Sequence, residues 1–224
     1  WPNWGYTLPE FIRTLNAWKA DKEPGQQHLY THAGFILLAL ALERRFGLPI
    51  DELMEQRLLR PLGMVSTTLP RRDDSPRGRL SAELASSAVQ GYADDSRPVG
   101  EPGDQQGYYH WPGTSQMYAS PRDMAIFLAA NLGELAIDRS LWEAIKLAQQ
   151  TVATIGPRNR QALAWEVIVG NAPTIVEKYG GLDNASAYIG MMPSRQFGIV
   201  ILGNRGNQYP HEVGRRILLE LAAR

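Results

Sequence analysis

The hydrophobic pattern of the chain changes from helical to strand-like in its last third. Four segments rich in β-branched, aromatic and other apolar residues, at 163–169, 174–179, 186–192 and 197–202, are separated by turns that contain glycine, proline or asparagine. Such a series predicts a meander of antiparallel strands. After it, Val213, Ile217, Leu218 and Leu221 fall at helical spacing. This spacing predicts an amphipathic helix that packs against the sheet.

Helical patterns dominate the rest of the chain. Thr7-Leu8-Pro9-Glu10 is typical of a helix start, and this first helix is expected to end near Lys22. Further helices are expected over 33–46, 51–60, 120–133 and 139–155, and the one over 33–46 is so apolar that we expect it to be buried. Helical periodicity fades over 71–118, which predicts a long loop with one short strand near 89–93.

Together these patterns predict an α+β fold in two regions. Residues 1–158 form a mainly helical region that contains the loop 71–118, and residues 159–224 form the antiparallel sheet with its C-terminal helix. With 224 residues the chain is long enough to bury a sizeable core.

Composition excludes several classes of function. The 23 Lys and Arg residues balance the 23 Asp and Glu residues, so no net field attracts nucleic acid. The absence of cysteine removes thiol nucleophiles and thiolate metal sites. The longest apolar run, 35–42, is far shorter than the roughly 20 residues that span a bilayer, so no membrane span is expected.

Two side chains could carry chemistry. Lys178 lies near the end of an apolar strand and is followed by Gly180-Gly181, where a ligand could approach the backbone closely. Tyr30 lies just before the apolar helix, with His32 two residues later. A phenol has a pKa of about 10, so it acts as a base only where a cation such as Lys178 stabilises the phenolate. Taken singly, each residue also fits a structural role, as an exposed strand-end lysine or a hydrogen-bonded tyrosine.

The order of short motifs along the chain is more specific. It runs Pro24-Gly25, Tyr30-Thr31-His32, Pro61-Leu62-Gly63-Met64, Gln90-Gly91-Tyr92, Leu163-Ala164-Trp165-Glu166, Lys178-Tyr179-Gly180, Gly198-Ile199-Val200 and Leu202-Gly203-Asn204-Arg205. This series resembles the class C β-lactamase and penicillin-binding-protein family of serine hydrolases, whose pattern runs Pro-Gly, Tyr-x-Asn, Pro-Leu-Gly-Met, Gly-Tyr, Gly-Leu-Gly-Trp-Glu, Lys-Thr-Gly, Gly-Ile-Val and Leu-Ala-Asn-Lys. The resemblance spans nearly the whole chain and implies the β-lactamase/transpeptidase-like fold.

The resemblance also implies roles for individual residues. Tyr30 would be the catalytic general base and acid, Lys178 would hold its phenolate and the substrate carboxylate, and the N–H of Gly181 would form half of an oxyanion hole. His32, Tyr179, Gly180 and Asn204 would line the substrate site. The implied substrate is a β-lactam or a peptidoglycan-derived peptide, the implied location is the periplasm or outside the cell, and no cofactor is expected.

Three departures from the family pattern bear on function. All four lysines lack a serine three positions earlier, so the family's Ser-x-x-Lys nucleophile is not in this sequence. We expect an upstream segment of the same protein to supply that serine, together with strands that complete the sheet. His32 replaces the family's Asn and Tyr179 replaces its Thr. A family member that binds β-lactams or peptidoglycan without hydrolysing them is therefore an alternative.

Histidines leave a third possibility open. His28 and His32 would share a face, and His110 in the long loop could join them near Tyr30 to hold zinc, although no known metal motif is present. A zinc-bound water could then replace the serine as nucleophile. Among serines inside this chain, Ser115 and Ser186 lie nearest the motifs, but no Gly-x-Ser-x-Gly sequence surrounds either of them.

Overall fold

The sheet is antiparallel and has six strands in sequence order. The computed structural model describes residues 7–69, 80–103, 111, 113–114, 117–170 and 172–223. The strands are β1 Ala153–Thr154, β2 Asn159–Gln161, β3 Glu166–Ile168, β4 Ile175–Leu182, β5 Ala185–Met192 and β6 Phe197–Gly203. The last three match the predicted segments closely, because their β-branched and aromatic residues favour strands, and most of β5 and the first part of β4 are buried. The predicted antiparallel meander is confirmed.

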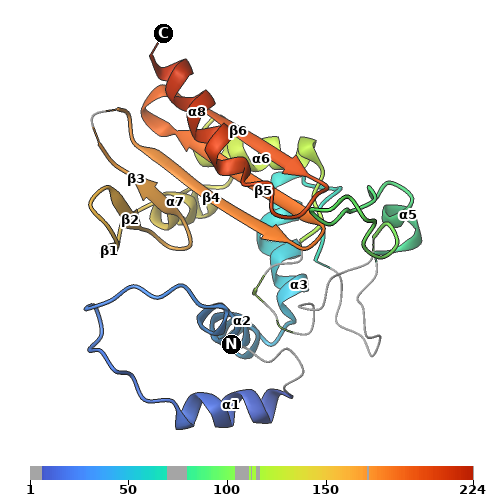
Figure 1. Cartoon of the computed structure of the whole chain (residues 1–224), viewed down its shortest axis with the longest axis vertical. Coiled ribbons are helices and arrows are strands. Elements are labelled where there is room, and N and C mark those ends of the chain that lie inside the picture. The colour runs from blue at the N-terminus through green and yellow to red at the C-terminus, as the bar shows by residue number, and fades with distance from the viewer. Residues whose placement is uncertain are drawn as a thin grey trace.

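Helices lie on both faces of this sheet (Figure 1). Helix α8, Pro210–Ala222, covers one face, where Leu218 packs with Ile175, Tyr188 and Met192. Helix α6, Pro121–Leu132, covers the other, where Leu128 packs with a second set of strand residues. The remaining helices are α1 Leu8–Ala17, α2 His32–Phe46, α3 Ile50–Met54, a π-helical turn Glu55–Leu59 leading into α4 Arg60–Leu62, α5 Ala82–Ala85, α7 Arg139–Ala148 and a 3-10 turn Pro193–Arg195.

Several predicted boundaries were wrong, each for a local reason. The first helix ends at Ala17 rather than near Lys22, because Trp18 is extended. The helix predicted over 139–155 ends at Ala148, because 152–155 pairs with β2, giving a strand β1 that was not predicted. The strand predicted near 89–93 is reduced to isolated bridges at Tyr92. The strand predicted over 163–169 shortens to β3, because Ala164 has a left-handed φ of 68° in the preceding turn.

The prediction of a buried helix over 33–46 was also wrong. Only Ala33, Ile36 and Ala39 of α2 are buried, and the first two pack with Phe11 and Trp111. Other apolar side chains of α2 are exposed, namely Phe35, Leu37, Leu38 and Phe46. The described elements therefore cover one face of α2, whereas the sequence has apolar residues all round. No helix in the described ranges has the length and hydrophobicity needed to cross a bilayer.

A buried ionic contact fastens α8 to the sheet. Glu177 of β4 has 0% exposed surface, and its carboxylate accepts hydrogen bonds from Arg215 of α8 and from the Tyr188 hydroxyl at 3.0 Å. Burial, and next the negative charge of Glu177, raises the pKa of Tyr188, so the hydroxyl stays protonated and donates. The hydrogen bond to Glu177 raises the pKa of Arg215.

Two glycines make room for the Tyr188 ring in this contact. A Cβ atom at Gly214 of α8 would lie 2.1 Å from the ring, and one at Gly190 of β5 would lie 2.1 Å from its hydroxyl oxygen. The ring therefore fits between helix and strand only because both positions lack a side chain. Helix α8 can approach the sheet closely, which brings Arg215 within reach of Glu177.

Replacing Arg215 with alanine is expected to lower the free energy of unfolding by about 3 kcal/mol, because the Glu177 carboxylate would remain buried without its cation. Arg216→Ala is the matched control. Its guanidinium is exposed and 3.9 Å from Glu220, so its loss should cost less than about 0.5 kcal/mol. Urea denaturation of the protein that contains this chain measures both. Equal losses in the two variants would show that the buried pair does not fasten α8.

Candidate active site

The candidate site lies where β4 loses its neighbour on one side. Strand β3 pairs with β4 only as far as Glu166 opposite Glu177, whereas β5 pairs with β4 out to Leu182. Within the described ranges, the edge of β4 from 178 to 182 therefore has no strand beside it on the β3 side. Unpaired backbone groups on such an edge can bind a ligand that has amide character.

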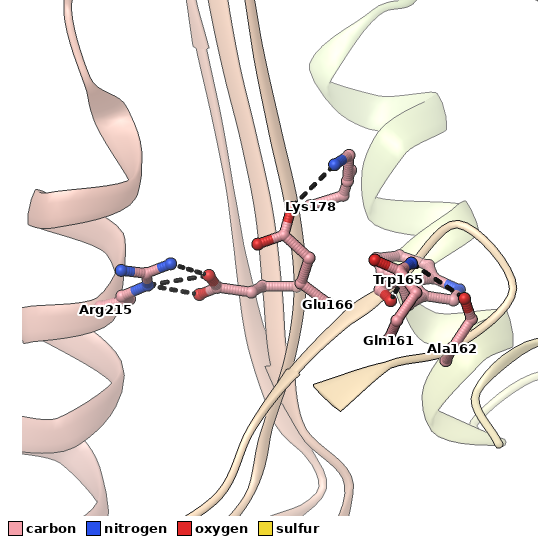
Figure 2. Close-up of polar contacts among 7 residues, drawn as sticks. Gln161, Ala162, Trp165, Glu166, Lys178 and Arg215 are labelled. Carbon is pink, nitrogen blue, oxygen red and sulfur yellow. Dashed lines mark hydrogen bonds and ion pairs between the residues drawn. The ribbon is translucent and has the colours of Figure 1, made fainter. Parts of the chain in front are cut away.

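Alternation along β4 sends neighbouring side chains to different partners. Glu177 and Tyr179 both contact α8, through Arg215 and His211 respectively. Lys178, between them, instead reaches Glu166 at the start of β3, with 2.8 Å between Nζ and Oε1. Figure 2 shows this contact and, on the far side of the strands, Arg215. The strand thus places one cation at its open edge.

The Lys178–Glu166 ion pair is partly shielded from water. The exposed fractions of the two side chains are 33% and 17%. A pair in such surroundings is screened less than one on the open surface, so the ammonium is held more firmly. The turn before Glu166 is itself fixed, because the Gln161 side chain donates to the carbonyl oxygens of Ala162 and Trp165 at 2.9 and 3.0 Å (Figure 2).

Tyr30 lies beside this cation, and its role as general base stays a prediction. Nζ of Lys178 lies over the Tyr30 ring, 4.9 Å from its centroid. The Tyr30 side chain is 60% exposed, so a ligand can reach it. The backbone turns into α2 just after it, because the Thr31 side chain caps the helix by accepting from Ala33 N at 3.2 Å. Two residues distant in sequence, Tyr30 and Lys178, are therefore brought together.

His32 also lies at this place. Its ring stands edge-on to the Tyr30 ring with 5.8 Å between centroids. Burial lowers the pKa of His32, which favours the neutral imidazole. The residue that replaces the family's Asn therefore does contact the candidate catalytic tyrosine.

The glycines after Lys178 leave open space, as the sequence suggested. A Cβ atom at Gly180 would have no heavy atom within 4 Å, and one at Gly181 would meet only Ala185 O, at 3.7 Å. Tyr179, in contrast, is 41% exposed and stacks on His211 with 4.1 Å between ring centroids. The edge of β4 therefore has an open part at the two glycines and an aromatic part beside α8.

Asn204 and Ser186 have partners elsewhere. The Asn204 side chain donates to Gln90 O at 2.9 Å, and its own carbonyl accepts from Tyr92 N at 2.9 Å. The buried Ser186 hydroxyl donates to Arg205 O at 2.7 Å. Both side chains thus fasten loops to the end of the sheet. A substrate contact for Asn204 stays a prediction, and Ser115 lies outside the described residues.

The zinc hypothesis involves three histidines. Across the described ranges, which include His28 and His32, no three His, Asp or Glu side chains lie close enough together to hold a metal ion. His110 lies outside these ranges, so the set of ligands that the sequence suggested is described only in part.

Sequence reasoning missed the residues that support the site. Glu177 and Arg215 were not singled out, because an acidic residue next to a lysine in a strand looks like a solvent-exposed pair. His211 was not singled out either, and only the contact with Tyr179 reveals it. Glu166 was matched as part of a motif, but its ion pair with Lys178 was not foreseen.

The chain is similar to known proteins over most of its length. The Beta-lactamase family model matches residues 2–224. D-alanyl-D-alanine-carboxypeptidase/endopeptidase AmpH of Escherichia coli K12 is 27% identical over 217 residues, which cover 92% of this chain and 51% of that protein. The chain therefore spans about half the length of this curated relative.

Solved structures share the fold. A beta-lactamase/D-alanine carboxypeptidase from Pseudomonas syringae superposes with a TM-score of 0.84 at 21% identity, covering 100% of this chain and 67% of that one. A class C beta lactamase from Rhodobacter sphaeroides gives 0.80 at 18% identity, with coverages of 99% and 67%. The expected β-lactamase/transpeptidase-like fold, helices followed by an antiparallel sheet with a C-terminal helix, is confirmed. The chain belongs to the beta-lactamase family.

Proposed function

We propose that the protein containing this chain is a serine hydrolase that opens the amide bond of β-lactams or cleaves a related peptide of the cell wall. The observation that carries the proposal is the position of the Lys178 ammonium, paired with Glu166 at 2.8 Å and lying over the Tyr30 ring at the open edge of β4. A phenol oxygen at this place could take a proton from a nucleophile and return it to a leaving group. Membership of the beta-lactamase family supports this chemistry.

The nucleophile in this proposal is a serine outside residues 1–224. No lysine of this chain has a serine three positions before it, and the chain spans about half of its curated relative. The serine oxygen attacks the carbonyl carbon, and its proton passes to the Tyr30 oxygen. When the C–N bond breaks, Tyr30 returns that proton to the leaving nitrogen. Water then attacks the acyl ester and gives a proton to Tyr30. As the bond between the acyl carbon and the serine oxygen breaks, Tyr30 passes that proton to the serine oxygen, which restores the hydroxyl and releases the carboxylic acid.

The open edge of β4 supplies the remaining groups. The N–H of Gly181 would donate to the oxyanion that forms when the carbonyl is attacked, and this hydrogen bond strengthens as negative charge develops. The open space at Gly180 leaves room for the substrate backbone. Lys178 would attract the substrate carboxylate, with His32 and Tyr179 bordering the same space. These steps require no cofactor.

The substrate class follows from the groups proposed to bind it. A cation next to a strand edge suits a carboxylate attached close to an amide, which β-lactams and D-alanyl-D-alanine peptides share. The carboxypeptidase/endopeptidase relative and the solved beta-lactamases support both substrates. A peptidoglycan-derived substrate would place the protein in the periplasm or outside the cell.

Replacing Tyr30 with phenylalanine in the full-length protein is expected to lower kcat for a chromogenic cephalosporin about 100- to 10,000-fold, because proton transfer loses its oxygen. The ring, and with it the contact with Lys178, would remain. Stopped-flow or steady-state absorbance measures the rate, and thermal unfolding checks that the variant is folded. Unchanged turnover in a folded Tyr30→Phe protein would refute the proposed role.

Replacing Lys178, which removes its ammonium group, should also lower activity strongly. Lys178→Ala is expected to lower kcat/KM at least about 100-fold, because it removes both the charge beside Tyr30 and the attraction for the substrate carboxylate. Lys146→Ala is the matched control, since Lys146 also lies over an aromatic ring, that of Trp142, but on α7. Kinetics with the same cephalosporin compares the two. If both variants kept full activity, Lys178 would have no part in catalysis.

A further inference from the structure

The position of Tyr179 beside Lys178 carries an inference that rests on the proposed function. We propose that Tyr179 is a positioning residue, whose ring holds the Lys178 ammonium in place for catalysis, and that His211 holds the Tyr179 ring. The resemblance implies only that Tyr179, at a position where the family pattern has threonine, lines the substrate site, and it names no role for the ring. The contacts of the ring supply one.

Among the described residues, three groups lie close to the ammonium. Nζ of Lys178 lies 2.8 Å from Oε1 of Glu166, 4.9 Å from the centroid of the Tyr30 ring and 5.8 Å from that of the Tyr179 ring. Cations are attracted to aromatic faces within about 6 Å of the centroid. If the carboxylate were its only partner, the flexible Lys178 side chain could adopt several conformations around it. The two aromatic rings reduce the number of these conformations. The ammonium is thereby kept near Tyr30.

The ring of Tyr179, rather than its hydroxyl, makes the contacts. Across the described part of the chain, the hydroxyl has no hydrogen-bond partner in the protein, and the side chain is 41% exposed. The ring instead stacks on the His211 ring, with 4.1 Å between centroids and 21° between planes. A threonine at this position could offer a hydroxyl but neither of these contacts.

His211 is itself held firmly. It lies in the first turn of α8, and Arg215, one turn later, forms the buried contact with Glu177 of β4. The stack therefore joins the same strand and helix as that contact. Among the residues that the structure describes, the buried Nδ1 of His211 has no hydrogen-bond partner. The contact that places the ring is therefore its stacking on Tyr179.

The test compares two replacements of Tyr179 in the full-length protein. Tyr179→Phe keeps the aromatic face and is expected to retain kcat within about twofold of the unmodified protein. Tyr179→Leu keeps an apolar side chain but loses the face, so we expect kcat to fall about 3- to 30-fold, the range of a cation–π contact. The loss should appear mainly in kcat, because the ring positions Lys178 toward Tyr30. Melting temperatures show whether both variants are folded.

Further variants keep the result decisive. His211→Phe preserves the stack and should retain activity, whereas His211→Leu should reproduce the loss seen in Tyr179→Leu. Tyr209→Leu is the matched control, because the Tyr209 ring is 6.2 Å from His211 but has no contact with Lys178 in the described part of the chain. Full kcat in Tyr179→Leu, or an equal loss in Tyr179→Phe, would overturn the inference.

The same series separates this inference from the proposed function. A large loss in Lys178→Ala together with unchanged Tyr179→Leu would contradict the positioning role alone. Unchanged activity in Lys178→Ala would contradict the role of Lys178 on which the inference rests.

Discussion

The fully buried carboxylate of Glu177 governs how strand β4 is presented to the rest of the molecule. Its partners are the Arg215 guanidinium of α8 and the Tyr188 hydroxyl of β5. A buried charge needs such partners, so β4, β5 and α8 are bound into one unit. Because side chains alternate along a strand, fixing Glu177 toward α8 directs Lys178 away from it. The buried contact thus sets the position of the catalytic candidate beside it.

The candidate site combines this rigid strand with a less enclosed helical region. Lys178 is anchored on the sheet by Glu166, whereas Tyr30 arrives from the segment before α2 and is largely exposed. The exposed apolar side chains of α2 lie in the same helical region. A further segment of the protein that packs against this region would cover the exposed apolar side chains. If the same segment carried the serine to Tyr30, it would also complete the site.

Much of the fold could be predicted, because strands 175–182, 185–192 and 197–203 have a strong strand pattern and long helices have clear caps. Strands β1 and β2 are too short to show any periodicity, which is why the helix before them was extended to 155. The burial of α2 was misjudged because apolar composition does not specify what covers a helix. Both errors arise because a helix's length and burial depend on the elements packed next to it, which its own residues do not specify.

The site was predictable only in part. The order of motifs led to Tyr30, His32 and Lys178, and the structure brings these three together. No pattern in the sequence shows that Glu166 pairs with Lys178 or that His211 stacks on Tyr179, because each contact joins separate elements. Asn204 matches a family motif, yet its amide is bonded to Gln90, so a motif fixes a position in the fold more securely than a contact with substrate.

In the proposed mechanism, this chain supplies the proton-transfer and substrate-binding groups for a serine that lies outside it. The most direct measurement is mass spectrometry of the full-length protein after reaction with a penicillin, with the acylated peptide mapped after digestion. We expect one adduct, on a serine outside residues 1–224. An adduct on a serine of this chain would contradict it. Binding of the penicillin without any covalent adduct would also contradict it, and would favour a family member that binds without hydrolysis.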